Sequence, residues 1–326
     1  MHRCDDVPRH FLAQVRKLRY ALPGQRLPER SFMSDAPVRP RRSVLYMPGA
    51  KTRALEKAAG LPADALILDL EDAVGPTEKD LARDLVAAKV RAKAFGKREV
   101  IIRVNGLDTL WGDADVRAAA AAGPDAILIP KVNSPADIAA VAAIMDEAGA
   151  PARTAIWAMM ETPLGILNAQ AIAQSPRLTC FILGTNDLVK DLNARHTDDR
   201  QPVITSLGIC LLAAKAYGLA CIDGVYNAYK DDAGLRTSCE QGLAMGFDGK
   251  TLIHPLQLAV TNEVFAPSAA DLDLAARQVA AFEDTRAKGE AVAVVDGKIV
   301  ENLHVETANR QLALAAAISA LEADLG

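Results

Sequence analysis

The sequence predicts an α/β fold, a (β/α)8 TIM barrel, and three observations support this prediction. Short apolar runs alternate with Ala-rich helical stretches from about residue 42 onward. The runs are almost continuously apolar, which is typical of parallel strands covered on both faces. Eight of them fall within about 215 residues, as expected for this barrel. A doubly wound open sheet is the alternative, but no G-x-G-x-x-G motif follows the first run.

The elements follow one another in a regular order. The expected strands are residues 43–49, 65–72, 99–106, 126–132, 155–163, 180–188, 219–226 and 249–255. Between them, residues 79–96 and 134–149 are typical helices, because Ala, Leu, Lys and Arg favour helical backbone. Ser134 before Pro135 indicates a helix start, and Gly149 indicates its end.

The chain continues for about 70 residues after the last expected strand. Residues 272–290 predict a helix, residues 291–304 predict a β-hairpin that turns at Asp296-Gly297, and a last Ala- and Leu-rich helix follows. A barrel does not need this segment. We therefore expect a barrel over 42–265 and a C-terminal extension over 266–326 that contributes to the active site and to an oligomer contact.

Residues 1–41 are rich in Arg and Pro and predict a loose N-terminal extension. No apolar core of a secretory signal follows the early basic residues, so secretion is not expected. A short basic amphipathic helix with a targeting role is the alternative. Met33 is a second possible start, which leaves open whether residues 1–32 are expressed.

The composition excludes several classes of function. A net charge of −4 and an aromatic content of 4% argue against nucleic-acid binding. The five cysteines form no C-x-x-C pair, so we expect reduced thiols in a cytoplasmic protein. No apolar run reaches the roughly 18 residues of a membrane span, so a membrane partner is not expected either.

Polar side chains gather at the ends of the expected strands, where barrel enzymes carry their active sites. They are Asp69, Glu71, Asp72, Arg103, Asn105, Lys131, Glu161, Asn186, Asp187, Asp223 and His254. Such groups on seven successive strand ends predict a shared polar mouth. This also explains why the apolar run 66–68 leads directly into three acids, which are costly to bury without partners.

The residue types at this mouth narrow its chemistry. Carboxylates without a Cys or His cluster favour a hard cation such as Mg²⁺, which takes one or two carboxylates together with water and substrate oxygens. Arg103 offers a planar fork suited to a substrate carboxylate. Asp69 and Asp72 have the alternative role of capping the next loop, and Lys131 that of a rim ion pair; His254 is expected to be structural. The pattern predicts an Mg²⁺ enzyme for an oxyacid and leaves the reaction open.

Seven motifs in this order then identify a family resemblance over residues 41–310. They are SVLYMPGAKTRALEKA, DLEDAV, IIRVNG, LIPKV, METPLGILN, GTNDL and GKTLIHP. Together they resemble the citrate lyase beta-subunit-like (HpcH/HpaI aldolase) family. The stretches WAMMETPLGILNA, GTNDLVKDL, IDGVYNAYKDDAGL and VAVVDGKIVENLH resemble its (3S)-malyl-CoA thioesterase branch.

The resemblance implies a (β/α)8 barrel that binds Mg²⁺, with Mn²⁺ as an alternative, through Glu161 and Asp187. Arg103 is implied to bind the substrate and act in catalysis, and Glu161 to touch the substrate through the ion. Glu71 and Asp72 are implied to hold metal-bound water.

Coenzyme A is implied to lie near Tyr46, Met47 and Lys51. In lyases of the family, an aspartate of the C-terminal segment reaches a neighbouring subunit's site in a trimer or hexamer, and Glu301 takes that position here. Its longer side chain moves the carboxylate by about 1.5 Å, which disfavours a reaction that needs exact placement.

The function that the resemblance implies is therefore Mg²⁺-dependent hydrolysis of (3S)-malyl-CoA to malate and CoA. The alternative is retro-Claisen cleavage of malyl-CoA or citramalyl-CoA, which gives glyoxylate or pyruvate and an acyl-CoA. A third interpretation is a barrel that binds acyl-CoA without turnover.

Overall fold

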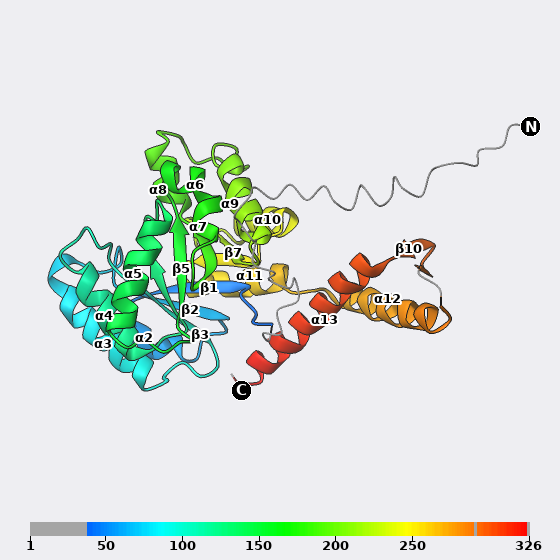
Figure 1. Ribbon diagram of the computed structural model, residues 1–326, viewed down its shortest axis with the longest axis horizontal. Helices are drawn as coiled ribbons and strands as arrows, with labels where there is room; N and C mark the ends of the chain where they lie inside the picture. Colours follow the sequence, from blue (N-terminus) through cyan, green and yellow to red (C-terminus); the bar gives the residue numbers. More distant parts are fainter. Residues whose placement is uncertain (1–37, 290–291, 325–326) are drawn as a thin grey trace, which may run out of the picture. The chain divides into compact units, whose positions relative to one another are not determined.

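The computed structural model describes residues 38–289 and 292–324, and most of the expected N-terminal extension lies outside them. Eight parallel strands close into a barrel, in which β8 pairs with β1, so the predicted fold class is confirmed (Figure 1). The strands are β1 (Ser43–Pro48), β2 (Ala65–Asp69), β3 (Glu99–Arg103), β4 (Ala126–Ile129), β5 (Ala155–Met160), β6 (Leu178–Leu183), β7 (Ala220–Asp223) and β8 (Gly249–Leu252).

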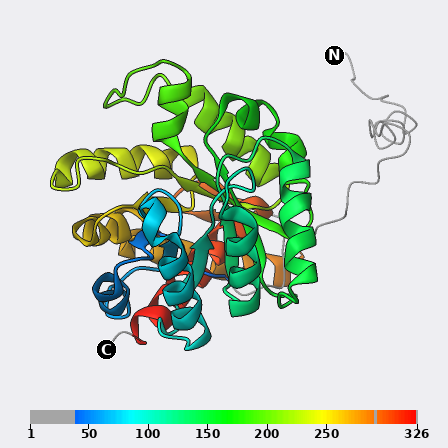
Figure 2. The same ribbon diagram turned by 90° about the vertical axis from the view of Figure 1, so that its left-hand side faces the viewer.

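Helices follow the strands and surround them, as Figure 2 shows. They are α2 (Thr52–Ala58), α3 (Lys79–Arg91), α4 (Gly112–Ala122), α5 (Pro135–Glu147), α6 (Pro163–Leu167), α7 (Ala169–Ala173), α8 (Thr185–Asp191), α9 (Ile204–Ala216), α10 (Asp232–Met245) and α11 (Leu258–Phe265), with short 3₁₀ turns η1 (Pro76–Glu78) and η2 (Pro255–Gln257). None of the helices described is long and apolar enough to cross a membrane.

The strands have two buried faces, and this determines which side chains can reach the site. On β2, Ala65 and Ile67 belong to the apolar cluster inside the barrel, whereas Leu66 and Leu68 belong to the cluster under the helices. Successive side chains of a strand point to opposite faces. Every second residue of each strand therefore faces the barrel interior, and the last such residue reaches its mouth.

The start and end signals of α5 are confirmed. Ser134 is its N-cap and forms a capping box with Asp137, and Pro135 is the first helical residue. Gly149 follows the helix with φ of 71°, a left-handed conformation that favours glycine. By contrast, α3 ends at Arg91, earlier than predicted, because Lys93 adopts a left-handed φ of 51°.

The C-terminal segment has the predicted helix, hairpin and helix. These are α12 (Ala269–Ala287), β9 (Ala293–Val295), β10 (Lys298–Val300) and α13 (Asn302–Glu322). Asp296 and Gly297 form the turn with φ of 50° and 72°, as a two-residue hairpin loop requires.

The end of α13 contacts residues next to the starts of the barrel strands. Glu322 lies 3.0 Å from the guanidinium of Arg42, and Asp324 lies 3.5 Å from the ammonium of Lys97. Arg310, earlier in the helix, lies 3.0 Å from Asp248. The extension is thus held at the end of the barrel opposite to the mouth.

Candidate active site

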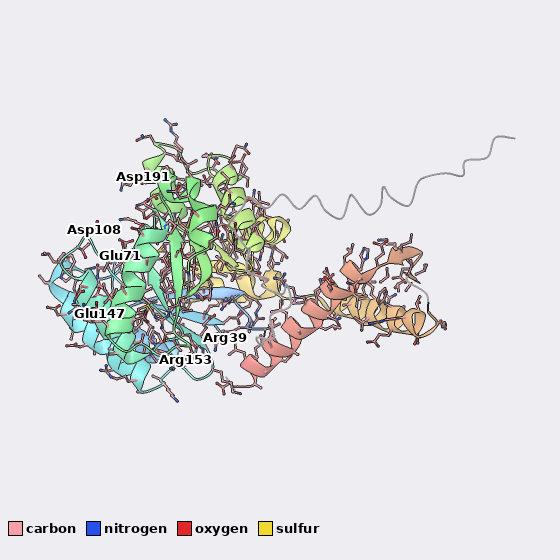
Figure 3. The ribbon with its side chains drawn as sticks, in the orientation of Figure 1. Arg39, Glu71, Asp108, Glu147, Arg153 and Asp191 are labelled. Atoms are coloured by element: carbon pink, nitrogen blue, oxygen red, sulfur yellow. The ribbon has the colours of Figure 1, made fainter. Side chains whose placement is uncertain are left out.

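Three predicted polar residues are in phase with the interior faces of their strands. Asp69 ends β2 in phase with Ile67, and Arg103 ends β3 in phase with Ile101. Glu161 follows β5 in phase with Met159. In Figure 3, Glu71 and Asp108, which follow β2 and β3, lie apart from Arg39 and Arg153, which precede strands.

Arg103 is locked in place by Asp69, a pair that the sequence analysis missed. Nε and Nη2 of Arg103 donate to the two carboxylate oxygens of Asp69 over 2.7 and 2.6 Å. The same oxygens accept the backbone N–H groups of Glu71 and Ala73 over 2.9 and 3.0 Å. Asp69 therefore caps the loop, as its alternative role predicted, and also orients Arg103. The register could have revealed the pair, because the two residues are partners between β2 and β3.

The remaining edge of Arg103 faces the mouth. Its guanidinium lies 4.8 Å from the ring centroid of Tyr46, and this cation–π interaction stabilises the positive charge. Nη1 lies 2.8 Å from Glu71 Oε2 and 3.4 Å from Asp72 Oδ2. Asp69 accepts two of the five N–H donors of the guanidinium and Glu71 faces a third, so two donors remain for a substrate oxygen while Arg103 keeps its position.

Glu161 lies against Gly184, at the end of β6 that leads into the helix carrying Asp187. Oε1 of Glu161 accepts the backbone N–H of Lys131 over 2.8 Å, and Lys131 adopts a left-handed φ of 49°. A Cβ atom at residue 184 would clash with both Oε2 and Cβ of Glu161, so only glycine lets this side chain lie against the end of β6. Asp187 follows three residues later, in the first turn of α8.

Two carboxyl groups of the mouth have raised pKa values, and burial is the main cause in both. Burial raises the pKa of Glu161 to about 7. The hydrogen bond from the backbone of Lys131 lowers this pKa, and the negative charges of Glu71 and Asp187 raise it. Burial likewise raises the pKa of Glu71 to about 7. The positive charge of Arg103 lowers this pKa, and the negative charge of Asp72 raises it further. Oε2 of Glu71 is buried and makes no well-aligned hydrogen bond.

These features fit a divalent cation. Within the described part of the chain, no three His, Cys, Asp or Glu side chains group closely enough to hold a metal ion. A cation at Glu161 and Asp187 must therefore take its other ligands from water and substrate, as Mg²⁺ usually does. Oε2 of Glu71, which pairs with Arg103 but makes no well-aligned hydrogen bond, is suited to accept one from such a water.

The raised pKa values predict that Mg²⁺ stabilises the protein more at pH 8 than at pH 6. Between about 4.5 and about 7, folded metal-free protein retains protons on Glu161 and Glu71 that the unfolded chain has lost. Its stability from these groups therefore falls as the pH rises through that window. Ion binding needs the deprotonated carboxylates and strengthens over the same range. Thermal unfolding with Mg²⁺ and with EDTA at both pH values measures how far the ion raises Tm at each pH. Equal increases in Tm at pH 6 and pH 8 would contradict the assignment of Glu161 to the ion site.

Gly184→Ala is predicted to lower kcat/KM by about 10²-fold, because an error of about 1 Å in a positioned group has that effect. The added methyl would displace Glu161. Gly208→Ala in α9 is the matched control, since nothing lies within 4 Å of its Cβ. The control is expected to keep full activity and to gain about 0.5–1 kcal/mol of stability. Steady-state kinetics and thermal unfolding of both variants decide, and an active Gly184→Ala enzyme would show that Glu161 is not held here.

The structure does not bring every predicted site residue to the mouth. Met47 is out of phase with Tyr46 and is buried in the cluster under the helices, so its side chain cannot line a coenzyme groove. Lys51 is exposed and lies 3.3 Å from Glu78. The Asp72 side chain is 67% exposed at the rim. Glu301 is exposed before α13, where its backbone N–H donates to His304, and no described contact joins it to the strand ends.

The expectation that Asp223 faces the mouth is wrong. Asp223 is out of phase with Ile222, which faces the barrel interior. Its carboxylate instead accepts Lys250 over 2.8 Å and Arg200 over 2.6 Å, close to α10 at Gly242. The two cations hold its pKa below the ordinary value against the effect of burial. This network is a structural ion cluster under the helices.

His254 has the structural role that was expected. Its Nδ1 accepts the backbone N–H of Leu256, and its side chain caps η2.

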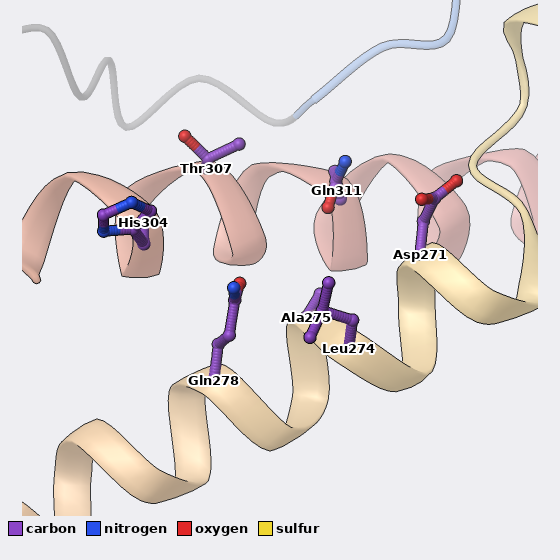
Figure 4. Close-up of a pocket in the computed structure, with 7 residues that line it drawn as sticks. All are labelled: Asp271, Leu274, Ala275, Gln278, His304, Thr307 and Gln311. Atoms are coloured by element: carbon purple, nitrogen blue, oxygen red, sulfur yellow. The ribbon is translucent and has the colours of Figure 1, made fainter. Parts of the chain in front are cut away.

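A separate pocket lies between α12 and α13 in the extension (Figure 4). Its lining residues are Asp271, Leu274, Ala275, Gln278, His304, Thr307 and Gln311. None of them was predicted as a site residue. Oδ2 of Asp271 is already bonded to Ser268 in the cap of α12, so the pocket offers no prepared polar group of the kind found at the mouth.

Comparison with known proteins relates this arrangement to others. Residues 42–255 match the family model described as HpcH/HpaI aldolase/citrate lyase. The chain is 57% identical over 284 residues to a (3S)-malyl-CoA thioesterase of Cereibacter sphaeroides, which covers 87% of this chain and 98% of that protein. It is 34% identical over 283 residues to the citrate lyase subunit beta of Escherichia coli, and the match covers 85% of this chain and 94% of that protein.

A solved structure is similar over most of the chain as well. The CitE protein of Mycobacterium tuberculosis in complex with magnesium, acetoacetate and coenzyme A superposes with a TM-score of 0.69. It is 26% identical in sequence, with 84% of this chain and 97% of that chain covered.

Proposed function

Because the chain belongs to the HpcH/HpaI aldolase/citrate lyase family, we propose that it is an Mg²⁺-dependent enzyme that hydrolyses (3S)-malyl-CoA to malate and CoA. The relatives named as (3S)-malyl-CoA thioesterases and the structural relative that contains magnesium and coenzyme A support this proposal. The observation that carries it is the guanidinium of Arg103, which Asp69 locks at a carboxylate-rich mouth and which keeps N–H donors beyond those that face Asp69 and Glu71.

In this proposal, the side chains of the mouth bind and orient the malyl group. The remaining N–H donors of Arg103 bind its carboxylate, while Asp69 and Tyr46 hold the guanidinium in position. Glu161 and Asp187 hold Mg²⁺, which when bound supplies a Lewis acid for the oxygens of the substrate. Glu71 accepts a hydrogen bond from water at the ion.

Hydrolysis then needs one water molecule and no other reactant. The water oxygen bonds to the thioester carbonyl carbon, the C–S bond breaks, and the sulfur leaves as the thiol of CoA after it takes a proton. Arg103 lies where it can offset the negative charge that develops on the substrate, an electrostatic effect that usually dominates such reactions. We place the CoA diphosphate at Lys51, which is exposed next to the end of β1.

We further propose that Glu301 acts in the site of a second copy, within a homotrimer or hexamer. Glu301 is exposed, and it belongs to an extension that its last turn fixes to the far end of the barrel. Asp72 and Glu301 would then orient the attacking water. Sedimentation velocity measures the assembly, and a fully active monomer would exclude Glu301 from the reaction.

A cytoplasmic location is also proposed. The four cysteines that the structure describes, Cys180, Cys210, Cys221 and Cys239, are buried free thiols. Reduced thiols are typical of proteins in a reducing compartment.

Product analysis tests the reaction directly. The purified chain is incubated with (3S)-malyl-CoA and Mg²⁺, and malate, glyoxylate, CoA and acetyl-CoA are quantified by chromatography. Malate and CoA in equal amounts support hydrolysis. Glyoxylate and acetyl-CoA in equal amounts would establish the lyase reaction instead. Binding of malyl-CoA without any product would show that the chain is an acyl-CoA binding protein and not an enzyme for this substrate.

A further inference from the structure

The side chain of Lys79 contacts the acid loop, by which we mean residues 70–75 between β2 and η1. Lys79 is the first residue of α3 and is only 6% exposed. Its ammonium donates to the carbonyl oxygens of Leu70 and Glu71 over 2.8 and 2.7 Å, and to Oδ1 of Asn105 over 2.7 Å. An ammonium has three N–H donors, so each donor has an acceptor.

Asn105, the acceptor that follows β3, is itself hydrogen-bonded to the next helix. Nδ2 of Asn105 donates to Oδ2 of Asp115 in α4 over 2.6 Å. Asp115 is fully buried, and its Oδ1 accepts Nε of Arg83 over 2.7 Å. Lys79 therefore joins the acid loop to a continuous buried network that spans α3 and α4.

A buried lysine at the start of α3 is energetically unfavourable unless its hydrogen bonds compensate for the position. A positive charge at the start of a helix opposes the helix dipole. An ammonium is also costly to bury unless its donors are satisfied. The ring of Trp111 lies 5.3 Å from Nζ and offers a face that suits a cation.

The bonds act on the backbone of Leu70, which is buried under the helices, and of Glu71, whose carboxylate reaches Arg103 at the mouth. Leu70 and Glu71 follow Asp69, whose side chain Arg103 holds. Lys79 holds the backbone of the next two residues at their carbonyl groups. With both sides fixed, the Glu71 carboxylate stays 2.8 Å from Nη1 of Arg103.

We propose that Lys79 is a positioning residue that clamps the Leu70–Glu71 backbone and thereby holds the Glu71 carboxylate at the Mg²⁺ site. This inference rests on the proposed function in one respect: Glu71 is taken to bind water at the ion. Lys79 itself touches neither ion nor substrate and acts only through Glu71.

Lys79→Met tests the clamp, because it keeps the length of the side chain and removes all three donors. Lys89→Met is the matched control, since Lys89 lies on the same helix and its ammonium makes one ion pair among the described residues, with Glu56 at 3.8 Å. Isothermal titration measures the Kd for Mg²⁺ without acyl-CoA, and kinetics at saturating Mg²⁺ measure kcat and KM. We expect a 10- to 100-fold higher Kd and about a tenfold lower kcat for Lys79→Met, with KM within about twofold. The control should match the wild-type chain in all three.

A folded Lys79→Met protein with the wild-type Kd and kcat would overturn the proposal. If circular dichroism shows that this variant does not fold, Lys79→Arg decides. Arginine keeps the charge, but its planar donors cannot meet three acceptors grouped around one nitrogen. Weaker Mg²⁺ binding by folded Lys79→Arg supports the clamp, and unchanged binding rejects it. Because the titration contains no acyl-CoA, a chain that binds Mg²⁺ but does not hydrolyse malyl-CoA rejects the proposed function without affecting this test.

Discussion

Asp187→Asn is expected to lower Mg²⁺-dependent turnover by about 10³-fold while the fold stays intact. An ion in this role contributes several kcal/mol to the transition state, and about 4 kcal/mol corresponds to that factor. The amide keeps the shape of the side chain and removes its charge. Asp187 makes no hydrogen bond or ion pair through its side chain within residues 38–289 and 292–324, so the substitution breaks no described contact.

Asp191→Asn is the matched control for this variant. Asp191 ends the same helix, is 38% exposed and lies 4.0 Å from Lys190, a distance at which an ion pair contributes little. Mg²⁺ titration and turnover of both variants decide the matter. Undiminished stimulation of Asp187→Asn by Mg²⁺ would remove Asp187 from the ion site.

Arg103→Met is expected to affect stability and activity together. The change leaves Asp69 and Glu71 without the cation that neutralises them, and breaking a buried ion pair in this way costs about 3–5 kcal/mol. Turnover of any protein that remains folded should fall by about 10²–10³-fold, because a donor to developing charge is lost. Urea unfolding and steady-state kinetics measure the two effects separately.

Arg117→Met provides the comparison on an exposed helix. Arg117 is 44% exposed and pairs with Asp113 and Glu147 at the surface, where solvent screens the pairs, so little loss of stability is expected. Arg103→Lys should retain part of the stability and little of the turnover, because lysine keeps the charge but not the fork that binds two oxygens. Wild-type turnover of Arg103→Met would exclude Arg103 from substrate binding.

The barrel was predictable because its signals are local. Each buried strand is an apolar run, and the hairpin turn at Asp296-Gly297 depends on two adjacent residues. The predicted runs nevertheless extended beyond several strands. β2 ends at Asp69, and the rest of DLEDAV forms a loop, because its acids need backbone and side-chain partners that a strand does not provide.

The site was predictable in its residue types and less so in its contacts. Strand periodicity separates Asp69, which shares the face of Ile67, from Asp223, which does not share the face of Ile222, and this signal was available in the sequence. Lys79 could not be found in that way, because it lies in a helix and its acceptors are separated from it in the chain.

The clamp around Lys79 also provides an optical probe. The chain has two tryptophans, and they occupy different environments. Trp157 is fully buried in the barrel interior, so its emission reports global unfolding. Trp111 packs against the ammonium of Lys79, so its emission reports local loosening of the acid loop. Intrinsic fluorescence can therefore distinguish a displaced loop from a melted barrel in one cuvette, without a label.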